Sequence, residues 1–253
     1  IEAEGFPREN VFGAFAGDDF RMENTYIFNN NEISNLGVGC LVFDNRKMHI
    51  EGTSITGWQS LGVEKTITNS NGNVVYSIDN SPALDVFLDY YGKTKSQIRT
   101  NNDIVKELSQ YPLLLNRNNN YYILRAPMMG NKEEGALVFS GKVEEGTKVK
   151  FSIPPGFEIL DHTADEVALL KNVIHSADAL ITFICKARHQ AFGPFIEEEL
   201  ESIRNLWDVS LVGFLSYGEI GKMQGHPSDF HNEPLSLMVL KENLEYLVIG
   251  FLA

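Results

Sequence analysis

Cysteine is scarce in this sequence, and long hydrophobic runs are missing. The only two cysteines, Cys40 and Cys185, each lie within an apolar run. We therefore expect buried thiols in a reducing compartment, which favours a cytoplasmic protein over a disulfide-bonded secreted one. The longest apolar runs, such as residues 179–185, are far shorter than the ~20 residues needed to cross a bilayer, so the sequence predicts no membrane span.

Positive charge is the second shortage. Lys and Arg number 21 against 34 Asp and Glu, and the formal net charge is −13. Because this excess repels phosphate backbones and anionic lipid headgroups, we expect neither a nucleic-acid partner nor a membrane partner. The motifs G-x-x-x-x-G-K, G-x-S-x-G and H-E-x-x-H are absent, so nucleotide binding, serine-hydrolase and metalloprotease activities lack support.

Apolar residues are plentiful and predict a folded chain. They make up 43% of the sequence, and aromatic residues make up 11%, which is enough to build a full core. In the first 80 residues, short apolar runs alternate with Asn, Gly and Asp clusters, a pattern typical of strands joined by turns. The predicted strands cover residues 11–15, 26–28, 38–43 and 49–56.

Stronger local signals follow. The pair Asn71-Gly72 tolerates the positive φ of a tight turn, and it predicts a β-hairpin between residues 65–68 and 74–78. Ser81-Pro82 precedes apolar residues at helical spacing, which predicts a helix that runs to about Tyr91. Another short helix precedes Tyr111-Pro112, and we place a module boundary near residue 110.

The second half changes its period from strand to helix. Amphipathic helices are predicted over residues 161–176 and 191–207, on either side of a buried strand at 179–185. The alternating strand-helix order from residue 147 to residue 215 predicts parallel strands covered by helices, and later hairpin-like segments predict antiparallel pairing. We expect an α/β fold with mixed α+β character, built from two similar modules, 1–110 and 111–253. The remaining predicted strands cover residues 121–126, 136–140, 147–152, 211–215, 235–240 and 246–252.

One sequence signature occurs twice. Residues 11–18 and 211–219 share an apolar pair, Gly, two apolar residues, a small residue, Gly and an acid, and an apolar strand follows each. We interpret them as two copies of one supersecondary unit. The first copy begins only ten residues into the chain, so we expect its preceding strand and helix to lie upstream of Ile1.

The second copy carries a family resemblance. Residues 213–221, with Tyr217-Gly218-Glu219, and the downstream Phe230-His231-Asn232 resemble the C-terminal module of FIST-domain (F-box and intracellular signal transduction) proteins. Residues 58–62 and 81–85 resemble the end of the family's N-terminal module, and 141–146 and 185–188 also match. Where the family usually has Thr, this chain has Pro234. The resemblance implies a cytoplasmic sensor of small ligands without catalytic activity, and amino acids or their derivatives are the ligands proposed for the family. We expect the ligand of this chain to be an amino acid or a small carboxylate.

Six residues are candidates for a ligand site. They are Arg188, Tyr217, Glu219, His231 and Asn232, with Asp18 in the equivalent place of the first copy. Tyr217, Glu219 and His231 would meet in one cleft if the strands that carry them pair antiparallel.

Each candidate has a structural alternative. Arg188 could instead form a surface ion pair with one of Glu197, Glu198 or Glu199, whose acidic run, including Glu201, we interpret as a solvated helix face. His231-Asn232 could simply set up a turn.

The alternative function is a hydrolase-type enzyme. It would use Cys185, with His189 four residues later, or a metal at His226 and His231 near Asp229. A structural thiol fits Cys185 better because the run before it is wholly apolar, and the His spacing matches no metal signature. We therefore expect no metal and no cofactor, and the downstream signalling partner is not encoded in the sequence.

Overall fold

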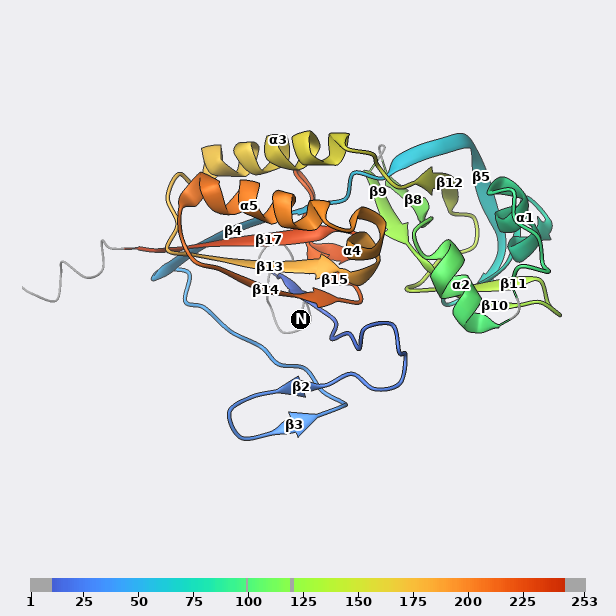
Figure 1. Ribbon diagram of the computed structural model, residues 1–253, viewed down its shortest axis with the longest axis horizontal. Helices are drawn as coiled ribbons and strands as arrows, with labels where there is room; N and C mark the ends of the chain where they lie inside the picture. Colours follow the sequence, from blue (N-terminus) through green and yellow to red (C-terminus); the bar gives the residue numbers. More distant parts are fainter. Residues whose placement is uncertain (1–10, 99, 119–120, 244–253) are drawn as a thin grey trace, which may run out of the picture. The chain divides into compact units, whose positions relative to one another are not determined.

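The computed structural model describes residues 11–98, 100–118 and 121–243 (Figure 1). These residues belong to two compact units. Unit 1 takes its residues from 1–56, 157–230 and 234–253, and unit 2 from 57–156 and 231–233. The mixed α+β composition confirms the predicted fold class. Among the described residues, none of the helices combines the length and the apolar character that crossing a bilayer requires.

A mixed four-stranded sheet forms the centre of unit 1. Its strands lie in the order β14 (Leu211–Ser216), β13 (Ala179–Cys185), β17 (Leu235–Glu242) and β4 (Met48–Ile55). β13 pairs in parallel with β14, whereas β17 pairs antiparallel with both β13 and β4. The sequence prediction of combined parallel and antiparallel pairing is confirmed for residues 179–185 and 211–215. It is wrong for residues 147–152, which pair antiparallel within unit 2.

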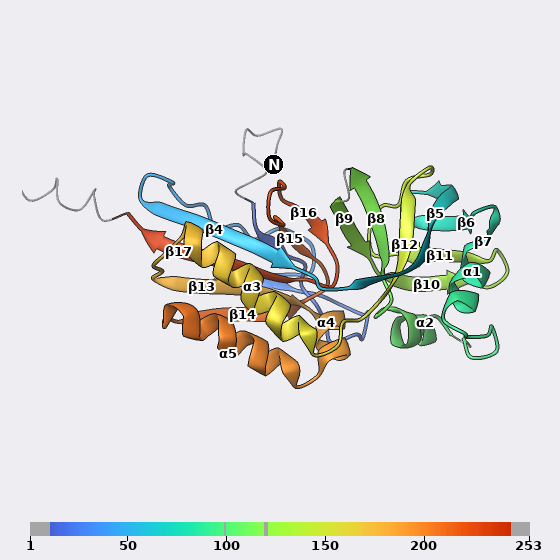
Figure 2. The ribbon, with the colours of Figure 1, turned by 90° about the horizontal axis from the view of Figure 1, so that it is seen from above.

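Helices cover one face of this sheet. α3 (Glu158–Val173) and α5 (Phe195–Trp207) lie side by side along it, and α4 (Lys186–Phe192) follows β13 directly (Figures 1 and 2). Each long helix buries one apolar stripe because residues three and four apart share a face. The buried apolar residues are Ile159, Val167 and Leu170 on α3 and Ile196, Ile203 and Trp207 on α5.

A small sheet joins the two copies of the signature. β1 (Gly13–Ala14) pairs antiparallel with β15 (Glu219–Gly221), and β16 (Asp229–His231) lies on the other side of β15. Phe15 N–H donates to the carbonyl of Gly218 at 2.9 Å, and Tyr217 N–H donates to the carbonyl of Phe15 at 3.1 Å. The ends of the two copies are therefore hydrogen-bonded to one another. A separate two-stranded ribbon consists of β2 (Ile27–Phe28) and β3 (Ile33–Ser34).

Unit 2 is built on an antiparallel sheet. Its order is β10-β11-β6-β5-β12-β8-β9, with β7 paired to β6. The strands and helices of this unit are β5 (Gln59–Asn71), β6 (Val74–Ile78), β7 (Ser81–Pro82), α1 (Ala83–Tyr90), α2 (Asn101–Leu108), β8 (Leu113–Asn118), β9 (Tyr121–Arg125), β10 (Pro127–Asn131), β11 (Ala136–Phe139) and β12 (Lys148–Ile153).

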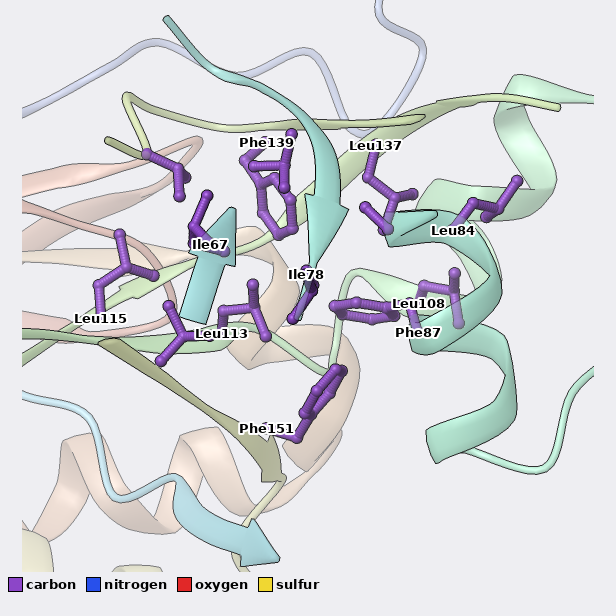
Figure 3. Packing of buried hydrophobic residues seen from close by; sticks show 14 of the residues in the cluster. Ile67, Ile78, Leu84, Phe87, Leu108, Leu113, Leu115, Leu137, Phe139 and Phe151 are labelled. Atoms are coloured by element: carbon purple, nitrogen blue, oxygen red, sulfur yellow. The ribbon is translucent and has the colours of Figure 1, made fainter. Parts of the chain in front are cut away.

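The core of unit 2 packs α1 against the sheet. Phe87 of α1 lies among strand side chains, with ring centroids 5.2 Å from Phe151 and 6.2 Å from Phe139 (Figure 3). The predicted hairpin is confirmed as β5 and β6, and Gly72 in its turn has φ +62°. That conformation needs glycine because a Cβ atom would be strained there.

Residues 38–43 correct a sequence prediction. They form no strand, and Cys40 is exposed rather than buried. Among the described residues no strand pairs with them, and a strand needs a neighbour to satisfy its backbone N–H and C=O groups. The two signature copies also differ locally, because β14 belongs to the four-stranded sheet whereas β1 belongs to the small one.

Other differences concern element boundaries. The predicted helix over 191–207 is divided into α4 and α5 at Gly193, which has φ +53°. The sequence places Ser81 as the N-cap and Pro82 at the first helical position, but Pro82 is the N-cap of α1. The strand predicted over residues 246–252 lies outside the described residues. The module boundary near residue 110 stays a prediction. Six of the described strands were not predicted from the sequence, namely β3, β7, β8, β10, β15 and β16.

Candidate functional site

Glu219 is a fully buried carboxyl group at the start of β15. The chain leaves β14 at Ser216 and turns through Tyr217 and Gly218, where φ is 149°. The Ser216 hydroxyl donates to Glu219 Oε1 at 2.5 Å. Glu219 Oε2 is buried and has no hydrogen-bond partner among the residues that the structure describes.

Burial controls the charge of Glu219. Loss of hydration raises its pKa from 4.5 to about 8, while hydrogen bonds from Ser216 and the Gly218 backbone and the nearby charge of Arg188 act in the opposite direction. At neutral pH most of this carboxyl is therefore protonated. A neutral carboxyl can donate one hydrogen bond, and it becomes an acceptor when a cation approaches.

Arg188 is held by a buried ion pair. Its Nε and Nη2 donate to Glu199 at 3.2 and 2.5 Å, and both side chains are fully buried. The Thr163 hydroxyl also donates to Glu199, at 2.5 Å. The predictions of a surface pair and of a solvated Glu199 are therefore wrong. Tertiary packing of α3, α4 and α5 encloses Glu199, whereas Glu197, Glu198 and Glu201 are not buried.

The Arg188 guanidinium also forms hydrogen bonds with the backbone at the end of β4. Arg188 Nη1 donates to the carbonyl of Thr56 at 2.6 Å and to that of Ile55 at 3.3 Å. The ring of Phe192 lies 4.6 Å from the guanidinium carbon. A positive charge is thereby fixed inside unit 1 within electrostatic range of Glu219.

Tyr217 and Asp18 connect the two signature copies. The Tyr217 hydroxyl donates to Asp18 Oδ1 at 2.5 Å and accepts a hydrogen bond from Phe20 N–H. Asp18 also accepts the N–H groups of Met22, Glu23 and Asn24, at 2.7–3.2 Å.

These hydrogen bonds shift both pKa values. The bond from Tyr217 is the main cause that lowers the pKa of Asp18 to about 2. Burial is the largest cause that raises the pKa of Tyr217 to about 12, and the hydrogen bond to Asp18 is the second. Asp18 thus stays ionised, and it organises the loop after β1.

His231 and Asn232 are buried residues that pack with unit 2. The Asn232 side-chain oxygen accepts a hydrogen bond from the Ser140 hydroxyl. The His231 ring meets the Tyr121 ring edge to face, with centroids 6.5 Å apart. The candidates thus form two groups, with Asp18, Arg188, Tyr217 and Glu219 in unit 1. Convergence of Tyr217, Glu219 and His231 on one cleft stays a prediction.

The enzyme alternative gains little from the geometry. Within 11–98, 100–118 and 121–243, no group of three or more His, Cys, Asp or Glu residues could hold a metal ion. Cys185 is a buried thiol at the N-cap of α4.

Sequence reasoning missed Ser216 and the burial of Glu199. Ser216 was visible only as the small residue three positions before Glu219, and nothing local marked Glu199.

Comparison with known families identifies the chain. The FIST N domain matches residues 2–81, and the FIST C domain matches residues 83–222. The chain belongs to the FIST family. FIST domains are sensory domains of signal transduction and are thought to bind small ligands. Two successive FIST modules fit the internal repeat found in the sequence. Neither the curated proteins nor the solved structures include a significant match.

Proposed function

We propose that this FIST protein is a cytoplasmic sensor that binds an amino acid or small carboxylate at a site built around Glu219. The observation that carries the proposal is a carboxyl group that is fully buried and has one oxygen without a partner among the described residues. Leaving a buried polar atom unpaired costs about 1–3 kcal/mol. A ligand that supplied the missing hydrogen bond would recover that free energy.

The neighbouring groups suggest a division of roles. A ligand ammonium group next to Glu219 would favour the carboxylate, so binding of a zwitterion would release a proton. The fixed charge of Arg188 would act on a ligand carboxylate, although its N–H groups already bind Glu199 and β4. Tyr217, with Asp18, would form one wall.

Thermal-shift measurements test the proposal. Unmodified protein is screened against the amino acids and a set of small carboxylates, because a ligand that binds only the folded state raises the melting temperature. Calorimetric titration then compares the wild type with Glu219→Gln. We expect affinity to fall at least tenfold in this variant. Glu201→Gln, an exposed change of equal charge on α5, is the matched control and should bind normally.

Two results would count against the site. If no compound in the screen raises the melting temperature, the proposed ligand class is wrong. If Glu219→Gln lowers the melting temperature without ligand but binds ligand as the wild type does, Glu219 is a structural residue only.

A further inference from the structure

Glu219 is fully buried, so a ligand can reach its carboxyl group only if a neighbouring segment moves. Its strand β15 pairs with β1, in which Ala14 faces Glu219. Residues 17–24 follow β1 and belong to no helix or strand, and most of them are exposed. This lid loop, residues 17–24, is therefore the irregular segment joined directly to the strand beside Glu219.

Tyr217 holds the lid loop to the turn before Glu219. Its hydroxyl donates to Asp18 Oδ1 at 2.5 Å and accepts the N–H of Phe20. The Tyr217 and Phe20 rings are stacked, with centroids 5.9 Å apart. A Cβ atom on Gly17 would lie 3.1 Å from the Tyr217 ring, so the loop backbone packs closely against that ring.

Lys186 holds the lid loop to α4. Its Nζ lies 2.7 Å from Asp19 Oδ1, and its side chain is largely covered although that of Asp19 is exposed. Lys186 is two residues before Arg188, the buried cation of the proposed site. The lid loop thus joins the two elements that carry the opposite charges of that site, the β14–β15 turn and α4.

The backbone of the lid loop is strained where these contacts hold it. Asp19, Phe20 and Met22 have φ values of 60°, 62° and 55°. Residues other than glycine, and bulky ones above all, rarely adopt this left-handed conformation because their Cβ atoms crowd the backbone. Such strain persists only where surrounding contacts impose it, so the loop will leave this conformation when the contacts break.

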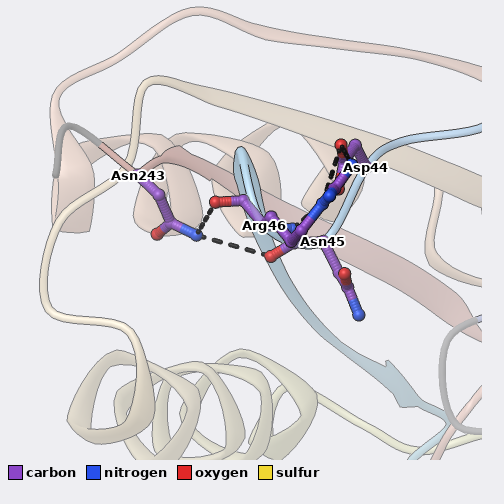
Figure 4. Close-up of polar contacts among 4 residues, drawn as sticks. All are labelled: Asp44, Asn45, Arg46 and Asn243. Atoms are coloured by element: carbon purple, nitrogen blue, oxygen red, sulfur yellow. Dashed lines mark hydrogen bonds and ion pairs between the residues drawn. The ribbon is translucent and has the colours of Figure 1, made fainter. Parts of the chain in front are cut away.

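The contacts before β4 are separate from those of the lid loop. Asn243 Nδ2 donates to the carbonyls of Arg46 at 3.1 Å and Asn45 at 3.4 Å (Figure 4). An ion pair of 2.7 Å joins Asp44 and Arg46 in the same turn. Opening of the lid loop therefore leaves the start of β4 in place.

We propose that residues 17–24 are the lid of the Glu219 site, and that the Tyr217–Asp18 and Lys186–Asp19 contacts keep this lid closed. The inference rests on the proposed function, because it describes how a ligand enters that site. In the closed state the Glu219 carboxyl group is out of reach of solvent. Breaking the two contacts releases the strained loop and opens a route to the carboxyl group.

Cys185 is a natural reporter of access to the site. This buried thiol belongs to the residue directly opposite Ser216 in the β13–β14 ladder, and the Ser216 hydroxyl binds Glu219. Facing residues of neighbouring strands share one face of the sheet. Cys40 is exposed and supplies the reference rate of alkylation. Arg21 is exposed within the lid loop, so cleavage by trypsin after Arg21 reports release of the loop itself.

Tyr217→Phe removes the hydroxyl that holds the lid and keeps the ring. In the full chain, iodoacetamide should label Cys185 at least tenfold faster in this variant than in the wild type, as measured by peptide mass mapping. The labelling rate of Cys40 should not change. Trypsin should cut after Arg21 at least tenfold faster. Both increased rates should depend only weakly on urea, because local opening exposes little surface.

Asp44→Asn is the matched control, because Asp44 also accepts N–H groups of a nearby residue in a surface turn. It should leave Cys185 labelling and Arg21 cleavage within twofold of the wild type. Lys186→Gln breaks the second contact of the lid. It should raise both rates at least twofold, and it keeps the proposal testable if Tyr217→Phe does not fold.

Three results would overturn the proposal. The first is unchanged cleavage after Arg21 in both lid variants, which shows that these contacts do not hold the loop. The second is faster cleavage with unchanged labelling of Cys185, which shows that the loop does not control access. The third is a steep urea dependence of Cys185 labelling, which indicates global unfolding. None of these measurements uses a ligand, so failure of the lid is distinguishable from failure of the ligand screen.

Discussion

The Glu219 carboxyl couples folding to pH. Its pKa is about 8 in the folded protein and 4.5 when solvated, so between these values the unfolded state binds fewer protons than the folded state. The contribution of Glu219 to the free energy of unfolding is therefore complete below about pH 4.5 and is lost as the pH rises to 8. Within this window the free energy of unfolding falls by at most about 1.4 kcal/mol for each pH unit.

The pH dependence of unfolding measures this coupling. Urea unfolding of the wild type and of Glu219→Gln at pH 5, 6, 7 and 8 should show a steeper loss of stability in the wild type, because the amide does not titrate. Parallel pH profiles for the two proteins would contradict the neutral, buried state of Glu219.

The stability effect of the buried Arg188–Glu199 ion pair can also be tested by substituting single residues. Removing one partner leaves a charge buried without compensation, so Glu199→Gln and Arg188→Met should each lower the free energy of unfolding by about 3–5 kcal/mol. The double variant should lose less than the sum of the two, because neither charge remains. Glu201→Gln is the exposed control and should change stability by less than about 0.5 kcal/mol. Additive losses in the double variant would show that the two side chains are not coupled.

At the scale of elements, the β5–β6 hairpin depends on Gly72. Its φ of +62° is unfavourable for residues other than glycine. No atom lies within 4 Å of the point that a Cβ atom would occupy, so a substitution would cause backbone strain but no steric clash. Gly72→Ala should lower the free energy of unfolding by about 1 kcal/mol, measured in urea. Gly72→Asn should lose less, because Asn adopts positive φ more readily. Equal losses of unfolding free energy in the two variants would show that the positive φ of Gly72 is not the cause.

The element boundaries show where local sequence is sufficient. The Asn-Gly turn and the apolar stripes of α3 and α5 were predictable because each depends on residues within a few positions of one another. Residues 38–43 have the composition of a strand, but a strand also needs a neighbour, and that neighbour is set by distant parts of the chain.

At the scale of the whole molecule, the two units differ in continuity. Unit 2 is almost one uninterrupted segment, residues 57–156, and it has a core of its own, whereas unit 1 is assembled from three segments. We expect residues 57–156 to fold alone, with cooperative unfolding reported by the fluorescence of Trp58, which is buried in the intact protein. The lost hydrogen bond from Ser140 to Asn232 should lower stability only slightly. A broad transition without cooperativity would contradict this independence.

By itself, the sequence determined the α/β class, the hairpin, the main helices and the FIST resemblance, because periodicity, turn residues and contiguous motifs are properties of neighbouring positions. It also drew attention to Glu219 through the repeated signature. Only the tertiary structure decided that Glu219 and Glu199 are buried while Cys40 is exposed. Burial depends on which distant segments pack together, and burial in turn sets whether a carboxyl group is neutral, as for Glu219, or held in an ion pair, as for Glu199.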